Sequence, residues 1–268
     1  QIGPITKTVA DAEIIFNVIK GKDIMDSTSI EIVGANSVNQ KKFSDEGGKI
    51  GIPVGFMDTD GIDETVLENF NESLEKFKSI GYEIKNIDLP NIKYSLAVYY
   101  IIMPAEVSSN LARFDGVKYG LHISGKNIID DYLMTRGGGF GKEARRRIML
   151  GTYVLSSGYY DAYYNKANQV RNLIKNDHKE AFNSVDIIMT PTTPAPAWKI
   201  GEKINNPLEM YLADIFTTPA NITGLPAISL PSGFKKVENK NLPLGIQLMS
   251  DYGREDVLFK AGKDFLGE

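Results

Sequence analysis

Cysteine is absent from this sequence of 268 residues, and histidine occurs only twice. Without cysteine the chain can form no disulfide bond, bind no metal through thiolates and use no cysteine nucleophile. No apolar run approaches the roughly 20 residues that a helix needs to span a bilayer, so we expect no membrane association. The lack of disulfides fits a reducing compartment, and we therefore expect a cytoplasmic protein.

No region of the sequence is enriched in charges of one sign. The 30 basic and 34 acidic side chains are interspersed and give a net charge of -4. A protein that holds a phosphate backbone by itself gathers Lys and Arg on one face. We therefore expect any nucleic-acid substrate to be held mainly by another chain.

Hydrophobic periodicity predicts an α/β protein. Helical spacing predicts a helix over Val9–Ile19 with Thr8 as its N-cap, and a second over Glu64–Ile80 that ends at a left-handed Gly81. Short buried runs predict strands at 49–54, 82–87, 186–190, 227–230 and 244–248. Further helices are expected over 94–120 with an interruption at Pro104, and over 143–178, 208–216 and 255–265. Strand, helix and strand in succession favour a crossover unit, and no linker divides the chain, so we assign residues 1–268 to one domain.

Three motifs that often carry chemistry are interpreted as structural. Gly137–Gly141 lacks the spacing of a phosphate-binding loop, so a flexible connection is favoured. His122 and His178 lack companions for a metal, and charged neighbours favour a solvated helix face for His178. The serine pairs 108–109 and 156–157 lie in helical runs, where hydroxyl groups usually bond back to the backbone. We therefore assign no catalytic residue and no metal site.

An arginine and an aspartate each stand beside apolar residues. Among Arg145, Arg146 and Arg147, the last adjoins the apolar run 148–150 and is the best candidate to point inward. Asp214 is a lone acid in a predicted apolar helix. A buried guanidinium needs a carboxylate partner, so one interpretation is a structural ion pair. The other is recognition of a free amino acid, with Arg147 on the α-carboxylate and Asp214 on the α-ammonium group. The residues alone favour the two interpretations equally.

Seven segments resemble the amidase-signature family, and they run in order almost from end to end. The segments that resemble the whole family are 1–12, 191–194, 218–233 and 243–248. The segments that are similar to the A subunits of glutamyl-tRNA(Gln) amidotransferases are 106–120, 140–152 and 155–164. Matches of this length in this order are highly specific.

The resemblance implies an α/β/α sandwich around a large mixed sheet, of which this chain is an incomplete portion. It implies a glutaminase that frees ammonia to convert Glu-tRNA(Gln) to Gln-tRNA(Gln). In that family a serine attacks the side-chain amide, activated through a second serine with a cis peptide bond and a lysine that serves as base. These residues lie upstream of the segment that matches Gln1 and have no counterpart here. Since the sequence also begins without Met or a signal-peptide pattern, we interpret Gln1 as a cut end and expect the chain alone to be inactive.

The resemblance also implies roles for three residues and for partner chains. By position in the matching segments, Tyr99 contacts glutamine, Arg147 holds its α-carboxylate and Asp214 its α-ammonium group. Partner chains, the B and C subunits, are implied; the B subunit uses ATP and Mg²⁺ and binds most of the Glu-tRNA(Gln). This chain is expected to bind no cofactor itself. The alternatives are another amidase-signature hydrolase of a small amide, or a non-catalytic interaction fragment.

Overall fold

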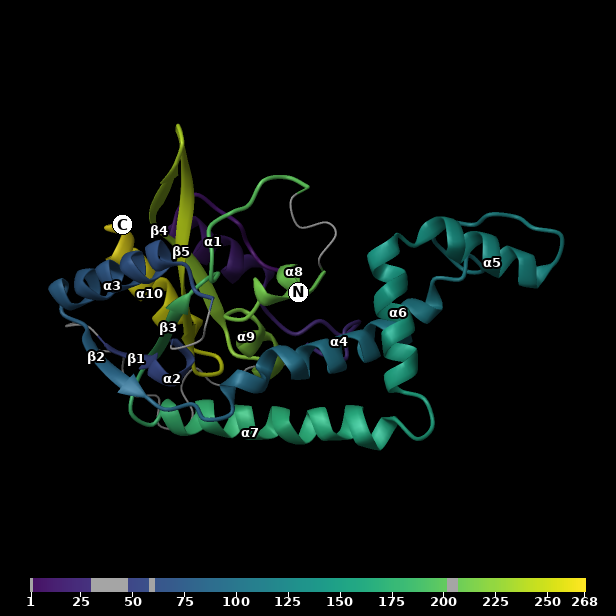
Figure 1. Cartoon of the computed structure of the whole chain (residues 1–268), viewed down its shortest axis with the longest axis horizontal. Coiled ribbons are helices and arrows are strands. Elements are labelled where there is room, and N and C mark those ends of the chain that lie inside the picture. Colours follow the sequence, from purple (N-terminus) through teal and green to yellow (C-terminus); the bar gives the residue numbers. More distant parts are fainter. Residues whose placement is uncertain (1, 30–47, 58–60, 202–206) are drawn as a thin grey trace. The chain divides into compact units, whose positions relative to one another are not determined.

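The computed structural model describes residues 2–29, 48–57, 61–201 and 207–268, the side chains of 207–209 excepted. The chain forms two compact units (Figure 1): unit 1 comprises residues 1–93 and 174–268, and unit 2 comprises residues 94–173. The assignment of residues 1–268 to one amidase domain stays a prediction.

Unit 1 contains the sheet, with helices on both of its faces. Its elements in chain order are α1 (Val9–Ile19), β1 (Lys49–Pro53), α2 (Val54–Met57), α3 (Glu64–Ser79), β2 (Glu83–Ile87), the 3-10 turn η1 (Ile92–Tyr94), β3 (Ile187–Pro191), α8 (Pro207–Leu212), α9 (Thr218–Thr223), β4 (Ala227–Val237), β5 (Lys240–Ser250) and α10 (Glu255–Leu266). Helix α7 (Lys166–Ala181) begins in unit 2 and ends in unit 1.

The sheet has five strands in the order β2-β1-β3-β5-β4. Strand β1 is parallel to both β2 and β3, whereas β5 is antiparallel to β3 and to β4. The parallel pairing of β1 and β2 through α3 confirms the predicted crossover unit, and the pairing directions confirm a mixed sheet. The hairpin of β4 and β5 is longer than the sequence predicted, because each strand has 11 residues.

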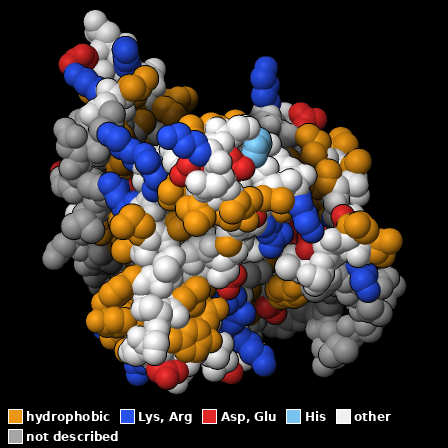
Figure 2. All heavy atoms as spheres, turned by 90° about the vertical axis from the view of Figure 1, so that its right-hand side faces the viewer, with side chains coloured by type: hydrophobic (Ala, Val, Ile, Leu, Met, Phe, Trp, Pro, Cys, Tyr) orange, Lys and Arg blue, Asp and Glu red, His pale blue; other side chains and the backbone are white. Residues whose placement is uncertain are grey.

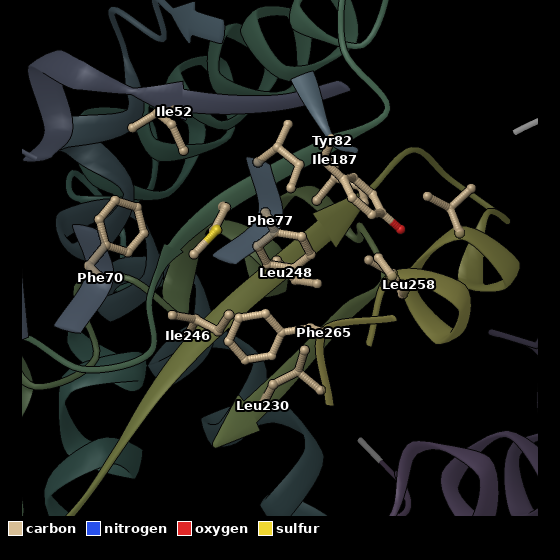
Figure 3. Close-up of a cluster of buried hydrophobic side chains, with 14 of the residues drawn as sticks. Ile52, Phe70, Phe77, Tyr82, Ile187, Leu230, Ile246, Leu248, Leu258 and Phe265 are labelled. Atoms are coloured by element: carbon tan, nitrogen blue, oxygen red, sulfur yellow. The ribbon is translucent and has the colours of Figure 1, made fainter. Parts of the chain in front are cut away.

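Both faces of the sheet are buried, so alternate side chains of one strand enter two different cores. In β3, Ile187 and Met189 join the core beneath α3 and α10, while Ile188 joins the core beneath α2 and α9. The first core is drawn in Figure 3, where Phe77 and Phe265 come together; their rings stack with centroids 4.8 Å apart. Burying a side chain of this size contributes about 1.5–3 kcal/mol. Helices on both faces of the sheet confirm the expected α/β/α sandwich.

Helix α1 begins at the predicted cap. The Thr8 hydroxyl accepts a hydrogen bond from the Asp11 N–H at 3.0 Å. The carboxylate of Glu268, the last residue, accepts from the N–H groups of Val9 and Ala10, each at 3.0 Å. The negative charge at this helix N-terminus is favourable, and it links the start of α1 to the residues that follow α10 within unit 1.

Unit 2 is helical. It contains α4 (Ser95–Asn110), the 3-10 turn η2 (Leu111–Arg113), α5 (Ile128–Gly139), α6 (Lys142–Val154), the π-helical turn η3 (Tyr160–Asn165) and the start of α7. Helix α4 packs against α6, and Gly151 of α6 lies against the backbone of Pro104. This close approach of two backbones is possible because Gly151 has no side chain.

The helix limits predicted in unit 2 differ from those of the structure. Helix α4 continues through Pro104, because packing against α6 outweighs the local cost of a proline, and it ends at Asn110 well short of residue 120. Residues 137–139 of the predicted loop 137–141 instead form the last turn of α5, and the connection to α6 is limited to residues 140–141. The long predicted helix 143–178 is broken after Val154, near Gly158, whose φ of 87° lies in the left-handed region.

Candidate functional site

The predicted carboxylate-binding arginine lies on α6, on the side that faces α4. The Arg147 side chain is 29% exposed, and its Nε donates a hydrogen bond to Oε1 of Glu143 at 2.9 Å. Its Nη1 contacts Sδ of Met103, on α4, at 3.3 Å. Arg145 and Arg146 are more exposed than Arg147. The prediction that only Arg147 of the three turns inward is therefore confirmed.

The guanidinium of Arg147 stays protonated. Partial burial acts to lower the pKa of Arg147, but the hydrogen bond and the charge of Glu143 outweigh it, with smaller contributions from Tyr99 and Tyr100. The pKa of Arg147 is therefore raised above its ordinary value. A half-buried guanidinium that stays protonated suits a carboxylate, which it can bind through two parallel hydrogen bonds.

The predicted glutamine contact lies on the helix that faces Arg147. Tyr99 is half-buried on α4, and its ring meets the ring of Tyr100 edge-on, with centroids 5.1 Å apart. Tyr99 and Met103 are four residues apart, so they share one face of α4. Unit 2 thus brings together the arginine and the tyrosine that the family resemblance selected, and their roles remain predictions.

Asp214 belongs to unit 1, and its local structure differs from the prediction. Helix α8 ends at Leu212, so Asp214 lies in a turn between α8 and α9 and not within a helix over 208–216. Its backbone carbonyl accepts hydrogen bonds from the N–H groups of Thr217 at 3.1 Å and Thr218 at 3.0 Å. The Asp214 residue is exposed. Its role toward an ammonium group remains a prediction.

Unit 1 has a wide, open hollow of about 990 Å³. It is lined by the extended segment 2–8, the first residues of β4, and polar residues that include Asn221 and Gln247. One serine in it, Ser229, pairs its hydroxyl with that of Thr192 at 2.9 Å. A second hydroxyl is neutral and cannot act as a base, so this pairing does not make Ser229 a nucleophile.

The serines and histidines to which the sequence assigned no catalytic role have structural surroundings. Ser108 and Ser156 donate their hydroxyl hydrogens to backbone carbonyls three residues earlier, at 2.9 and 2.7 Å, as predicted. The expected helical run around 156–157 is wrong, because α6 ends at Val154 and these two residues lie in the turn that follows it. His122 is exposed, with its ring nitrogens near Gly116 O and Ser124 Oγ. The prediction for His178 is wrong: the residue is 1% exposed, and Nδ1 lies 2.8 Å from Ile174 O. Burial lowers the pKa of His178, so the ring is held neutral.

Glu143 is the residue that sequence reasoning missed. It uses both carboxylate oxygens, Oε1 on Arg147 and Oε2 on Arg146, the latter at 2.6 Å. Spacings of three and four residues on one helix bring these groups together, and that spacing was the signal in the sequence. Among the described residues, no cluster of three His, Asp or Glu side chains could hold a metal. None of the described helices is long and apolar enough to cross a membrane.

The sequence and the fold are similar to those of known proteins. The Amidase family matches residues 1–259. The A subunit of glutamyl-tRNA(Gln) amidotransferase from Thermodesulfovibrio yellowstonii is 53% identical over 93% of this chain and 51% of its own length. The A subunit from Thermoanaerobacter pseudethanolicus is 49% identical over 99% of this chain and 54% of its own length. The chain thus spans about half the length of these relatives.

Solved structures show the same fold. The crystal structure of the A subunit of glutamyl-tRNA(Gln) amidotransferase from Thermotoga maritima aligns with a TM-score of 0.69 and 40% identity, over 99% of this chain and 50% of that one. A bacterial aryl acylamidase of the amidase signature family aligns with a TM-score of 0.70 over 98% of this chain and 52% of that one, but at 17% identity it supports the fold alone. A family match over nearly the whole sequence, on a mixed sheet covered by helices on both faces, shows that the chain belongs to the amidase family.

Proposed function

We propose that this chain is part of the glutaminase subunit of a glutamyl-tRNA(Gln) amidotransferase. In this proposal the intact protein hydrolyses glutamine and supplies ammonia for the conversion of Glu-tRNA(Gln) to Gln-tRNA(Gln). The observation that carries it is the identity of about half of the residues to proteins named as the A subunit of that enzyme, sustained over 93% and 99% of this chain. The half-buried, protonated Arg147 supports an amino acid as the substrate.

The proposed substrate is L-glutamine. The guanidinium of Arg147 holds the α-carboxylate, the ring of Tyr99 contacts the substrate, and Asp214 receives the α-ammonium group. The described residues supply binding groups, while the hydroxyls of Ser108 and Ser156 are paired with carbonyls and not with a base. We therefore propose that residues 1–268 alone do not hydrolyse glutamine, and that the nucleophile and the base belong to the rest of the amidase domain.

The proposed partners are the B and C subunits of the same enzyme. The relatives are named as one subunit of an amidotransferase, and exposed apolar residues of unit 2 support the presence of partners. On the face shown in Figure 2, where α5 and α6 lie, apolar side chains form several patches among Lys and Arg. Helix α5 contributes exposed Ile128, Ile129 and Leu133. Where exposed apolar side chains form a contiguous patch, they often mark a protein-interaction surface, which supports partner subunits for this chain.

The tRNA and the nucleotide are assigned to the partner. We propose that the B subunit uses ATP and Mg²⁺ to activate Glu-tRNA(Gln) and holds most of that tRNA, because the net charge of this chain is -4. We also propose that the complex works in the cytoplasm, because its product would serve protein synthesis there. No observation specifically favours another small amide as substrate or a purely non-catalytic role.

The proposal is tested by ammonia release from L-glutamine in the full-length protein made with its partner subunits. Arg147→Ala removes a charge-assisted contact of about 1.5–3 kcal/mol, which raises the KM for glutamine about 10- to 150-fold. Arg145→Ala, on the same helix but exposed, is the matched control and leaves KM unchanged. An active wild-type enzyme whose KM is insensitive to Arg147→Ala contradicts the assigned role. A full-length complex that releases no ammonia contradicts the proposed function.

A further inference from the structure

We infer that Glu143 is a positioning residue for glutamine: it fixes the guanidinium of Arg147 in the orientation that receives the α-carboxylate, and Arg146 offsets the negative charge that Glu143 brings. The inference rests on the proposed function, because it gives Arg147 a carboxylate ligand. It goes beyond that function by assigning work to two residues that touch no substrate.

The orientation follows from which nitrogen Glu143 engages. Oε1 of Glu143 accepts from Nε of Arg147 at 2.9 Å, so the Nε edge of the guanidinium is occupied. On the other side, Nη1 lies 3.3 Å from Sδ of Met103, a weak acceptor that does not consume both of its hydrogens. The edge formed by Nη1 and Nη2 is the one that can present two parallel donors to a carboxylate. Glu143 and Met103 together restrict the rotation of an otherwise flexible side chain.

A carboxylate beside a binding arginine weakens the attraction of that arginine for an anion, and Arg146 counteracts this effect. Alone, Glu143 would neutralise Arg147 and repel the carboxylate of an incoming amino acid. The second oxygen of Glu143 instead accepts from Nη1 of Arg146 at 2.6 Å. Two guanidinium groups share this carboxylate, so the three side chains together carry one net positive charge. Glu143 can therefore orient Arg147 without cancelling its attraction for an anion.

Burial decides which member of the cluster binds the ligand. The side chain of Arg147 is 29% exposed, against 46% for Arg146 and 47% for Glu143. Fixed charges in a partly desolvated place act more strongly than those in water. Preorganising such a group lowers the entropy lost on binding, which is how residues behind a binding group raise affinity.

The first test separates a role toward the α-carboxylate from a role in folding. In the full-length enzyme with its partner subunits, Glu143→Ala raises the KM for L-glutamine about tenfold and leaves kcat within about twofold. With 4-aminobutanamide, which is glutamine without its α-carboxylate, the same variant leaves kcat/KM unchanged. Glu143→Gln retains an acceptor for Nε and gives an intermediate KM. Glu75→Ala removes a similar exposed ion pair from α3, with Lys78 at 2.6 Å, and serves as the matched control.

The second test asks whether Glu143 acts through Arg147. In an Arg147→Ala background, Glu143→Ala should add no further rise in KM, because the group that it positions is gone. Arg146→Gln should raise KM for glutamine by a few-fold, and added salt should reduce that difference because it screens charge.

Two results would overturn the inference while leaving the proposed function intact. One is an active wild-type enzyme in which Glu143→Ala leaves the KM for glutamine unchanged. The other is an effect of Glu143→Ala without the expected selectivity: it is equal for glutamine and 4-aminobutanamide, or it is fully additive with Arg147→Ala. Loss of ammonia release in the wild type itself would instead count against the proposed function.

Discussion

Replacing Gly151 with alanine should separate the two helices that carry Tyr99 and Arg147. A Cβ atom at position 151 would lie 1.9 Å from the carbonyl oxygen of Pro104 and 2.8 Å from Cβ of Ser108. Real Cβ atoms essentially never approach a neighbour closer than 3.0 Å. The nearest obstacle is backbone, which cannot rotate away, so α4 and α6 must move apart by about 1 Å and lose dispersion contacts along their interface.

The expected loss combines two opposing effects. Overpacking of this kind costs about 1–3 kcal/mol, and contact with backbone places Gly151→Ala toward the upper end. Alanine recovers about 1 kcal/mol in helix propensity. The matched control is Gly137→Ala in α5, where a Cβ meets nothing within 4 Å, so only the propensity gain remains. Urea unfolding of the full-length protein should show a lower midpoint for Gly151→Ala and a slightly higher one for Gly137→Ala. Equal midpoints for the two variants would refute the close packing of α4 on α6.

Two further stability effects follow from buried or capping groups. Burial lowers the pKa of His178, so below about pH 6.5 the unfolded chain binds more protons than the folded one and stability falls as pH drops. His178→Phe should flatten the dependence of the urea midpoint on pH between about 5 and 7.5. An unchanged slope would contradict the burial. Asp63 caps α3 by accepting from the Thr65 N–H at 2.9 Å, and it pairs with Lys235 at 2.6 Å. Asp63→Ala should therefore lower the free energy of unfolding by about 1–2 kcal/mol, and Lys235→Met should lower it less. Equal losses for the two variants in thermal unfolding would mean that the cap contributes nothing.

The sheet-bearing unit was predictable because its signals are local and periodic. Helix α1 has the predicted bounds, and α3 ends one residue before the predicted end. Gly81, predicted as a left-handed terminator, has a φ of 99°. An amphipathic helix between two short strands leaves few alternatives to a parallel crossover.

The helical unit was harder because tertiary packing decides its boundaries. The glycines of α5 look like a loop, but they let other segments approach: a Cβ at Gly138 would lie 2.8 Å from Ile123 Cδ1, and one at Gly139 would lie 3.3 Å from Leu121 Cδ2. The low helix propensity of glycine is offset by those contacts. No property of residues 137–139 alone reports that a neighbouring segment fills the space.

His178 shows a signal that was present and was misjudged. Its charged neighbours in sequence favoured a solvated face, but they point elsewhere around the helix. Counting by helical turns gives a buried stripe of Ala167, Ile174, His178 and Ala181. Spacings of seven, four and three residues keep all four on one side of α7. Periodicity therefore outweighs the charge of adjacent residues as a guide to burial.

The structure adds an observation to each of the two interpretations of Arg147 that the sequence left equal. A half-buried guanidinium requires a carboxylate partner, and the structure supplies Glu143 from the same helix, four residues earlier. If that pair were only structural, one carboxylate for one guanidinium would suffice and the pair would be neutral. Glu143 also forms an ion pair with Arg146, so two guanidinium groups share its single negative charge. Of these two, Arg147 is the one more shielded from water. The pairing with Glu143 is what the structural interpretation predicts, whereas the guanidinium edge that Glu143 leaves open suits the α-carboxylate of an amino acid. The KM of Arg147→Ala for glutamine therefore decides between the two interpretations.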